Sequence, residues 1–410
     1  MNKKRILGIV AEYNPMHNGH LYHIKESKKI VNPDYTVAVV SGNFTQRGET
    51  SIIDKWQKAK NVVENGIDMC VELPTIYSVS SAENFANGAI KILSEIGVTD
   101  ISFGAETDDL ESLQTLANLF NDEPIEYKNM LKDELNKGLS FPKARENAVC
   151  RFFNDERFRK IIDKSNNILA IEYIKNILKI NSNLNDEKKI NPIIIKRKNV
   201  DYNSNEVVEN FASSSKIREF ICNNEFDKIK NVVPQNTYDL LMNNLGKKTL
   251  HKTIADFEKI IIYKLRMMSI DEIKNISDVS EGLENLIKSE SLKKSNLNDL
   301  IDGLKSKRYT RARIQRILTC ILLGITKDDI QLSKEVIPYI SVLAFNDKGK
   351  EILSLINQTS NEKNEMFDNN INDKLKVIVN GKDIEKLDNA PKLKRLFEID
   401  KNAEKIFTIY

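Results

Sequence analysis

The sequence predicts an α/β fold, in which a doubly wound parallel sheet is followed by a mainly α-helical C-terminal domain. Two observations lead to this prediction. Short apolar runs alternate with stretches of helical period in the first hundred residues, which is the pattern of βαβ units. Beyond about residue 235, helical periodicity dominates. We therefore expect an α/β domain over residues 1–235 and a helical domain over residues 236–410.

The expected strands are short apolar runs bounded by breakers or polar residues. They cover residues 5–11, 35–41, 69–73, 100–103 and 192–196. The second run, YTVAVVS, is apolar and β-branched, as in a strand buried on both faces, and the last, PIIIK, is expected to be buried too. Pro74 and Gly104 are expected to end the third and fourth strands.

The expected helices alternate with these strands. They cover residues 21–30, 55–64 and 82–96, and residues 108–180 form a helical insertion. Ser213 is the expected N-cap of a helix that begins in FASSSKIREFI. Residues 357–374 are polar and are expected to form a mobile loop.

Composition narrows the class of protein but not its partners. The 410 residues are 40% hydrophobic and 30% charged, with a net charge of +3. No apolar run approaches the roughly 18 residues of a membrane span, so we expect a soluble, cytoplasmic protein without a membrane partner. The four cysteines are widely spaced and contain no CxxC pair, which fits a reducing compartment and no cysteine-based metal site.

Three of the four histidines cluster directly after the first expected strand, as His17, His20 and His23. Ligands of α/β sheets bind at the carboxyl ends of strands. Pro15 ends the strand, Gly19 lets a ligand approach the backbone, and the start of the next helix favours an anion. This order of residues predicts a phosphate site of the kind that nucleotidyl transfer needs.

Two other interpretations of the histidine cluster stay open. The three histidines could bind zinc or iron, although no nearby cysteine or paired carboxylate completes a ligand set, and we predict no metal-binding residues. They could also be structural. His23 alone is as readily a packed or surface residue as a ligand contact.

Longer segments carry a specific resemblance. HNGH has the form of the HxGH signature of the nucleotidyltransferase superfamily. The string EYNPMHNGHLYHI closely resembles the bacterial tRNA(Met) cytidine acetate ligase family. Further matching segments follow in order, and they are SGNFTQRGE, DKWQKAK, VELPTIYSVSSAENFANGA, SFGAE, SNNILAIEYI, FASSSKIR and, more weakly, SKRYTRARIQRILTCILLGI. The resemblance therefore covers nearly the whole chain.

The resemblance implies both a fold and a reaction. The fold is a Rossmann-like nucleotidyltransferase domain that binds ATP. The reaction is the activation of acetate as acetyl-adenylate, with release of pyrophosphate, followed by transfer of the acetyl group to N4 of the wobble cytidine of elongator tRNA(Met). Mg²⁺ is expected to accompany ATP.

The resemblance also implies the ATP-binding residues. His17 and His20 would act as the catalytic residues that face the phosphates. The full set is Val10, Ala11, Glu12, Tyr13, Asn14, Pro15, Met16, His17, Asn18, Gly19, His20, Leu21, Tyr22, His23, Gly104, Asn166, Arg197, Ser213, Ser215 and Arg218. This chain departs from the family pattern at Met16, at Ser165 and at Ser215. Because Ser165 replaces a proline, either Asn166 or Asn167 could make the nucleotide contact.

A basic segment predicts an RNA partner. Residues 303–327 contain no acidic residue and carry an apolar face at helical spacing, from Ile314 to Leu322. Four basic residues at its amino-terminal end are predicted to contact RNA phosphates, and they are Lys307, Arg308, Arg311 and Arg313. The alternative is a core helix with a solvated basic end.

Two rival functions stay open from the sequence. A small-molecule nucleotidyltransferase would release a stable dinucleotide without RNA, whereas a ligase would form a reactive mixed anhydride. A non-catalytic RNA-binding protein would have no need for the HNGH motif. The acetate pocket, the base that accepts the cytidine proton and the oligomeric state are not predicted.

Overall fold

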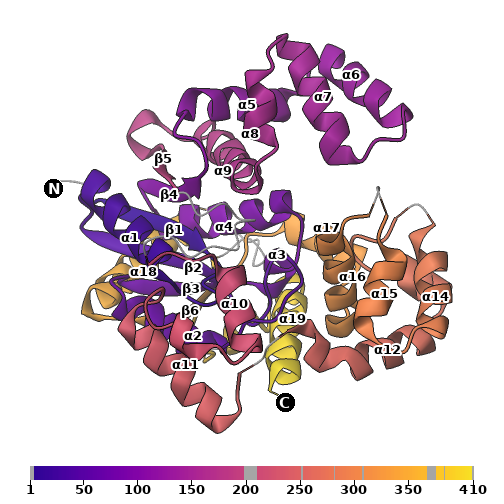
Figure 1. The fold of residues 1–410 in the computed structure, drawn as a ribbon. Coiled ribbons are helices and arrows are strands. Elements are labelled where there is room, and N and C mark those ends of the chain that lie inside the picture. The colour runs from indigo at the N-terminus through magenta and orange to yellow at the C-terminus, as the bar shows by residue number, and fades with distance from the viewer. Residues whose placement is uncertain are drawn as a thin grey trace.

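The computed structural model describes residues 4–197, 210–250, 253–280, 282–306, 309–366, 375–382 and 384–408 (Figure 1). At its centre is a seven-stranded sheet with the order β5-β4-β1-β2-β3-β6-β7. The strands are β1 (Ile6–Ala11), β2 (Tyr35–Ser41), β3 (Met69–Leu73), β4 (Asp100–Ala105), β5 (Asn191–Lys196), β6 (Ile340–Phe345) and β7 (Val377–Val379).

The first five strands are parallel, which confirms the predicted sheet. Two strand predictions need correction. β4 continues through Gly104 to Ala105, because β5 pairs with it as far as Ala105–Lys196. β5 is only partly buried, with Ile195 as its one buried residue, because it lies at the edge of the sheet.

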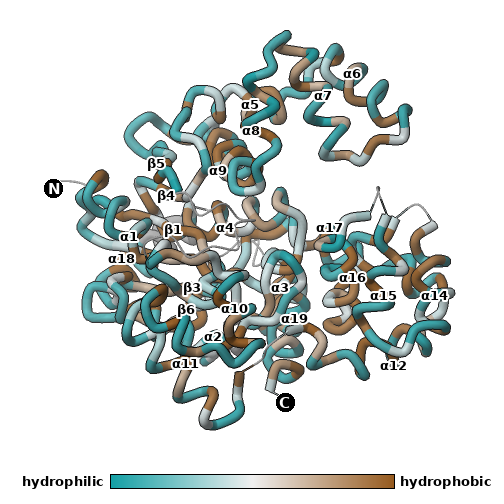
Figure 2. The backbone as a smooth tube through the Cα atoms, in the orientation of Figure 1, coloured by the Kyte–Doolittle hydropathy of each residue, from teal (hydrophilic) through white to brown (hydrophobic). Residues whose placement is uncertain are grey.

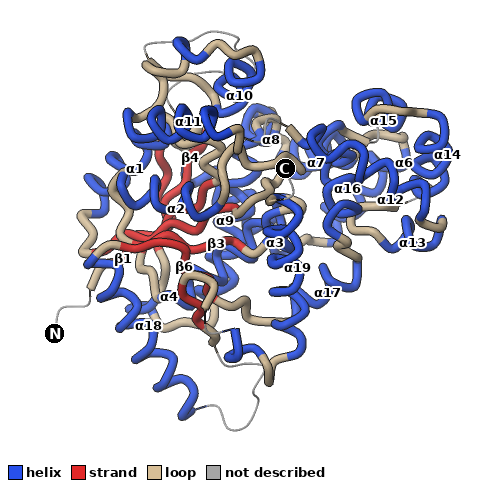
Figure 3. Tube along the Cα trace, turned by 90° about the horizontal axis from the view of Figure 1, so that it is seen from below, coloured by secondary structure: helices blue, strands red, loops and turns tan. Residues whose placement is uncertain are grey.

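Helices cover both faces of the sheet (Figure 3). The run of β2 is apolar throughout because both faces of the strand are buried. Ala38 and Val40 belong to one hydrophobic cluster, and Val37 and Val39 belong to the other. Two of the helices on the Ala38 face are α1 (Asn18–Val31) and α2 (Lys55–Glu64). Helices on the opposite face are α3 (Thr75–Ser78), α4 (Ala82–Ile96), α9 (Ser165–Asn181) and α18 (Asp347–Met366).

The predicted helical stretch between residues 108 and 180 connects β4 to β5. It consists of α5 (Leu110–Asp122), α6 (Ile125–Asn136), α7 (Phe141–Phe153), α8 (Arg157–Ile162) and α9. Two helices then follow β5, namely α10 (Ser214–Cys222) and α11 (Gln235–Lys247). Ser213 is the N-cap of α10 and accepts a hydrogen bond from the Lys216 backbone N–H at 3.2 Å, as predicted.

Beyond α11, a helical body lies beside the sheet (Figure 1). It contains α12 (Glu258–Met267), α13 (Ile270–Asn275), α14 (Leu283–Lys293), α15 (Leu297–Leu304), α16 (Arg311–Leu323) and α17 (Lys327–Glu335). The predicted apolar face of α16, from Ile314 to Leu322, is buried. One hydrophobic cluster extends from the sheet into this body, and brown segments in Figure 2 follow the central strands and alternate with teal along the outer helices.

The C-terminal part is mainly helical, as predicted, but it also adds two strands to the sheet, β6 and β7, which were not predicted. β6 pairs antiparallel with β3, and β7 pairs parallel with β6. The run ISVLAF of β6 is short and apolar, and periodicity alone does not distinguish such a run from a buried helical segment. The last helix, α19 (Pro391–Phe407), packs on α3 and α16.

The predicted polar loop over residues 357–374 is wrong in its first part, which belongs to helix α18 as far as Met366. Residues 367–374 lie outside the described residues. Among the helices in the described ranges, none is long and apolar enough to cross a membrane.

Candidate active site at the carboxyl edge of the sheet

A cavity of about 540 Å³ opens at the carboxyl ends of β1 and β4. The chain passes from β1 to β2 on one side and places β4 on the other, so this is the switch point at which doubly wound sheets bind ligands. Most residues predicted for the ATP site line this cavity. They are Val10, Ala11, Glu12, Tyr13, Asn14, His17, Gly19, His20, Tyr22, His23, Gly104, Asn166, Arg197, Ser213 and Arg218.

Five residues of the predicted ATP site do not line the cavity, namely Pro15, Met16, Asn18, Leu21 and Ser215. Met16 is buried in the cluster under α1. The Asn18 side chain donates to the carbonyls of Asn210 and Asn231, both at 3.0 Å, and so ties α1 to a distant segment. Ser214 lines the cavity, whereas the Ser215 hydroxyl accepts a 3.4 Å hydrogen bond from Arg218.

His17 and His20 are held by the start of helix α1. His17 is its N-cap, and its Nδ1 accepts a hydrogen bond from the Gly19 N–H at 3.1 Å. His20 Nδ1 accepts from the His17 N–H at 3.3 Å. A Cβ on residue 19 would lie 2.9 Å from His17 Cε1, so glycine is required for the His17 ring to fold over the backbone.

These hydrogen bonds define which nitrogen of each neutral imidazole ring carries the proton. A neutral imidazole that accepts at Nδ1 carries its proton on Nε2, so each ring offers one N–H donor. The two rings stack with centroids 3.6 Å apart. Burial, together with the positive charge of Arg197, lowers the pKa of His17 to about 3. Burial also holds the pKa of His20 well below its usual value. Both rings are therefore neutral near pH 7.

His23 is placed differently. Its Nε2 lies 3.0 Å from the Ser102 hydroxyl, which in turn lies 2.7 Å from the Ser27 hydroxyl. Burial lowers the pKa of His23 to about 4. Within the described ranges, no group of three or more His, Cys, Asp or Glu side chains is arranged to hold a metal ion.

Two arginines from distant elements also line the cavity. Arg197 follows β5, and its side chain passes 3.5 Å from the position that a Cβ on Gly104 would occupy. Arg218 of α10 donates to the Asn14 carbonyl at 3.0 Å. The amino termini of α1 and α10 thus border the same cavity as two guanidinium groups, an arrangement suited to a polyanion.

The structure separates the roles of the two neighbouring asparagines. Asn167 is buried, and its Oδ1 accepts from the backbone N–H groups of Glu106 and Thr107, at 2.8 and 3.2 Å. Asn166 lines the cavity and donates to Glu106 Oε1 at 2.5 Å. Asn167 therefore fixes the loop after β4, and of the two asparagines it is Asn166 that a ligand in the cavity could contact.

Of the four predicted RNA-binding residues, the structure describes Arg311 and Arg313. Lys307 and Arg308 lie outside the described residues. Arg313 donates to the Asp278 carbonyl at 2.8 Å and lies over the Tyr309 ring, so it packs the helical body together. Arg311 is exposed, with its guanidinium 3.4 Å from Asp302.

The sequence analysis missed two other walls of the cavity. The first is apolar and includes Phe85, Phe103 and Tyr173. The second comes from the loop after β2 and from α16, and its residues are Thr45, Gln46, Arg47, Glu49, Ala312 and Arg316. Two segments that carry the family resemblance could have indicated these walls. SSAENFANGA contains Phe85 of the first wall, and SGNFTQRGE contains the loop residues of the second wall.

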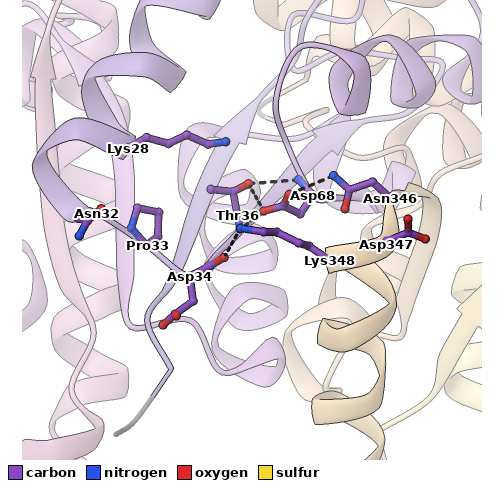
Figure 4. A pocket seen from close by; sticks show the side chains of 9 residues that line it. All are labelled: Lys28, Asn32, Pro33, Asp34, Thr36, Asp68, Asn346, Asp347 and Lys348. Atoms are coloured by element: carbon purple, nitrogen blue, oxygen red, sulfur yellow. Dashed lines mark hydrogen bonds between the residues drawn. The ribbon is translucent and has the colours of Figure 1, made fainter.

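A second hollow, of about 570 Å³, lies at the opposite, amino edge of the sheet (Figure 4). Its buried carboxylate, Asp68, accepts hydrogen bonds from Thr36 and Asn346, and Lys348 donates to the Asp34 carbonyl. These polar groups satisfy one another. This edge carries the amino ends of the five parallel strands, whereas ligands of doubly wound sheets bind at the carboxyl ends of the parallel strands, so the first cavity is the candidate active site.

Comparison with known proteins defines the class. The family model described as HIGH Nucleotidyl Transferase matches residues 4–410, so the chain is a member of that family. More particularly, it belongs to the tRNA(Met) cytidine acetate ligase family. It is 45% identical to the tRNA(Met) cytidine acetate ligase of Thermoanaerobacter sp. (strain X514), over 87% of this chain and 86% of that protein. It is 40% identical to that of Clostridium acetobutylicum, over 87% and 88%.

Solved structures agree with this assignment. Thermotoga maritima TmcAL bound with alpha-thio ATP superposes with a TM-score of 0.86 at 33% identity, covering 99% of this chain and 94% of that one. The apo form of the same protein gives 0.89 at 32% identity, with the same coverage. The predicted family and the predicted fold class are therefore confirmed.

Proposed function

We propose that this protein is an ATP-dependent, AMP-forming ligase that acetylates N4 of the wobble cytidine of elongator tRNA(Met). The observation that supports this most directly is the cavity itself. One of its walls carries the neutral His17 and His20 rings between two helix amino termini, and another comes from α16 of the helical body. The names of the relatives add the acceptor and the acyl donor.

The first step is attack of an acetate oxygen on the α-phosphorus of ATP. A C–O–P linkage forms, the bond from the α-phosphorus to the bridging oxygen breaks, and pyrophosphate leaves with the bonding electrons. Acetate is already ionised at neutral pH and needs no base. His17 and His20 stabilise the negative charge that develops on the phosphate oxygens by donating from Nε2, and Arg197 adds a positive charge.

The second step transfers the acetyl group. N4 of cytidine attacks the acetyl carbonyl carbon, a C–N bond forms, the bond from that carbon to the AMP oxygen breaks, and one N4 proton is lost to solvent. Mg²⁺ bound to the ATP phosphates would further neutralise the leaving pyrophosphate. A cytoplasmic location is part of the same proposal, because tRNA and ATP are both found there.

The experiment combines the protein with ATP, Mg²⁺, isotopically labelled acetate and unmodified elongator tRNA(Met), without acetyl-coenzyme A. Digested nucleosides are analysed by mass spectrometry. Labelled N4-acetylcytidine is the expected product. A stable dinucleotide formed without tRNA would instead identify a small-molecule nucleotidyltransferase. A complete lack of ATP turnover would leave the non-catalytic RNA-binding protein.

A further inference from the structure

Part of the cavity is lined by residues outside the predicted ATP-binding set, and this part is called its second end. The rim loop, defined here as residues 45–49, and helix α16 form this end, through Arg47, Ala312 and Arg316 among others. The rim loop follows β2, and α16 lies more than 250 residues further along the chain. A single cavity is therefore lined both by the wall that contains His17 and His20, called the histidine wall, and by the helical body.

The rim loop is fixed on the α16 side by close backbone contact. Gly48 lies so near to α16 that a Cβ there would be 2.5 Å from the Gln315 carbonyl carbon. The Thr319 hydroxyl donates to the Gly48 carbonyl at 2.8 Å, and the Gln315 side-chain amide donates to Glu49 at 2.6 Å. The loop and the helix thus form one continuous wall.

The rim loop is also fixed on the nucleotide side. The Gln46 N–H donates to Glu12 Oε1 at 2.7 Å, and Glu12 belongs to the segment that leads into the histidine motif. The same five-residue loop therefore touches the phosphate-binding segment at one side and α16 at the other. A ligand seated between Arg47 and Arg316 would lie directly beside a nucleotide in the histidine wall.

The charges at this end suit an RNA base and its phosphate. Arg316 is mostly buried and is oriented by Asp278, with Nε 2.7 Å from Oδ2. Within the described part of the chain, its two Nη groups make no hydrogen bond, and Arg316 lines the cavity. On the outer surface of the same helix, Arg311 is exposed. A strand of RNA that crosses the outer surface could insert one unpaired base at the rim.

We propose that this end of the cavity, between the rim loop and α16, is the acceptor subsite, in which an unpaired pyrimidine nucleotide of the RNA is held against the acetyl-adenylate. The inference rests on the proposed function and assigns the place of its second substrate. Arginine planes stack on unpaired bases and bind phosphates, which are the recognition elements of single-stranded RNA. Ala312, one helical turn before Arg316 on α16, lines the same cavity as a small residue that leaves room for the base.

The test separates the two half-reactions. Acetate-dependent ATP–pyrophosphate exchange, measured without RNA, reports formation of the adenylate, and transfer of labelled acetate to tRNA(Met) reports the second step. Ala312→Trp should lower kcat/KM for tRNA by at least about tenfold while it changes exchange by less than about threefold, because a bulky side chain fills the acceptor end only. Arg316→Ala should show the same split.

A matched control accounts for the packing role of Arg316. Asp278→Asn removes the charge of the same ion pair but keeps a side-chain oxygen that can accept from Arg316 Nε, so the guanidinium stays oriented at the rim, and asparagine tolerates the φ of +66° found at this position. Acetyl transfer by Asp278→Asn should stay within about threefold of the parent protein. If Asp278→Asn instead loses transfer but keeps exchange, as expected for Arg316→Ala, then Arg316 has only a structural role.

Normal transfer by Ala312→Trp would overturn the proposal. Equal loss of exchange and transfer in Ala312→Trp would assign the rim to ATP and overturn it too. Absence of both reactions in the parent protein would refute the proposed function instead.

Discussion

The two ends of the cavity are built in opposite ways. The histidine wall comes from one continuous segment, in which His17 caps α1 and every hydrogen bond that orients His17 and His20 lies within four residues. The rim is held by hydrogen bonds from Gln315 to Glu49 and from Thr319 to Gly48, and each of these pairs is separated by more than 260 residues in the chain. The comparison teaches that the proposed phosphate site is locally encoded, whereas the proposed acceptor subsite depends on the packing of the helical body against the sheet.

The largest expected effect is the loss of ATP–pyrophosphate exchange when a histidine of the histidine wall is replaced. His20→Ala should lower acetate-dependent ATP–pyrophosphate exchange by about 10²–10³-fold, because it removes an N–H donor aimed at developing phosphate charge. His17→Ala should do the same. His17→Asn is the matched control for the helix cap, since asparagine is a good N-cap but lacks the Nε2 donor. Exchange at the parent rate in both alanine variants would contradict the assignment of the phosphate site.

The next largest effect is a loss of stability when the contact between the rim loop and α16 is disturbed. Gly48→Ala should lower the free energy of unfolding by about 2 kcal/mol or more, since the new Cβ meets the backbone of Gln315 at a φ of +73°. Gly97→Ala is the control, because its φ is +85° but nothing lies within 4 Å of the new Cβ. Urea denaturation measures both variants. Equal losses in the two would show that the rim loop does not bear on α16.

A smaller effect concerns the neutral state of the histidine wall. The folded protein holds the pKa of His17 at about 3, below its ordinary value near 6.5. The unfolded chain therefore binds a proton first as the pH falls. His17 should contribute a loss of stability of up to about 1.4 kcal/mol per pH unit below pH 6.5, levelling off near pH 3, and no loss above pH 7. Urea titrations of the parent protein and of His17→Asn between pH 5 and 8 measure this slope. A slope that does not change in the variant would show that His17 titrates normally.

The smallest effect concerns the outer surface of α16. Arg311→Ala should weaken tRNA binding by a few-fold and reduce the slope of log Kd against log salt by about 1, as expected when one phosphate contact is lost. Exchange should be unaffected, because Arg311 does not line the cavity. Filter binding at several salt concentrations gives the slope. An unchanged slope would leave Arg311 as a solvated surface residue.

Local sequence predicted most of the sheet and much of the site. β2, β3, α2 and α4 begin and end at the predicted residues, because each carries a full apolar pattern between strong breakers. Ser213 caps α10 as predicted, since an N-cap hydrogen bond spans only three residues. Asn166 and Asn167 could not be separated, because their difference arises from contacts with the loop after β4.

What the sequence by itself determined about this protein is the histidine motif, the parallel strands and the family resemblance, because each is written within short contiguous segments. The tertiary structure alone decided that β6 and β7 extend the sheet, that Arg313 donates a hydrogen bond to Asp278, and that Arg47 and Arg316 line one cavity. The physical reason is the range of the interactions. Caps and helical periods act over three to four residues, whereas strand pairing and the contact of Gly48 with α16 join positions that only the packed core brings together.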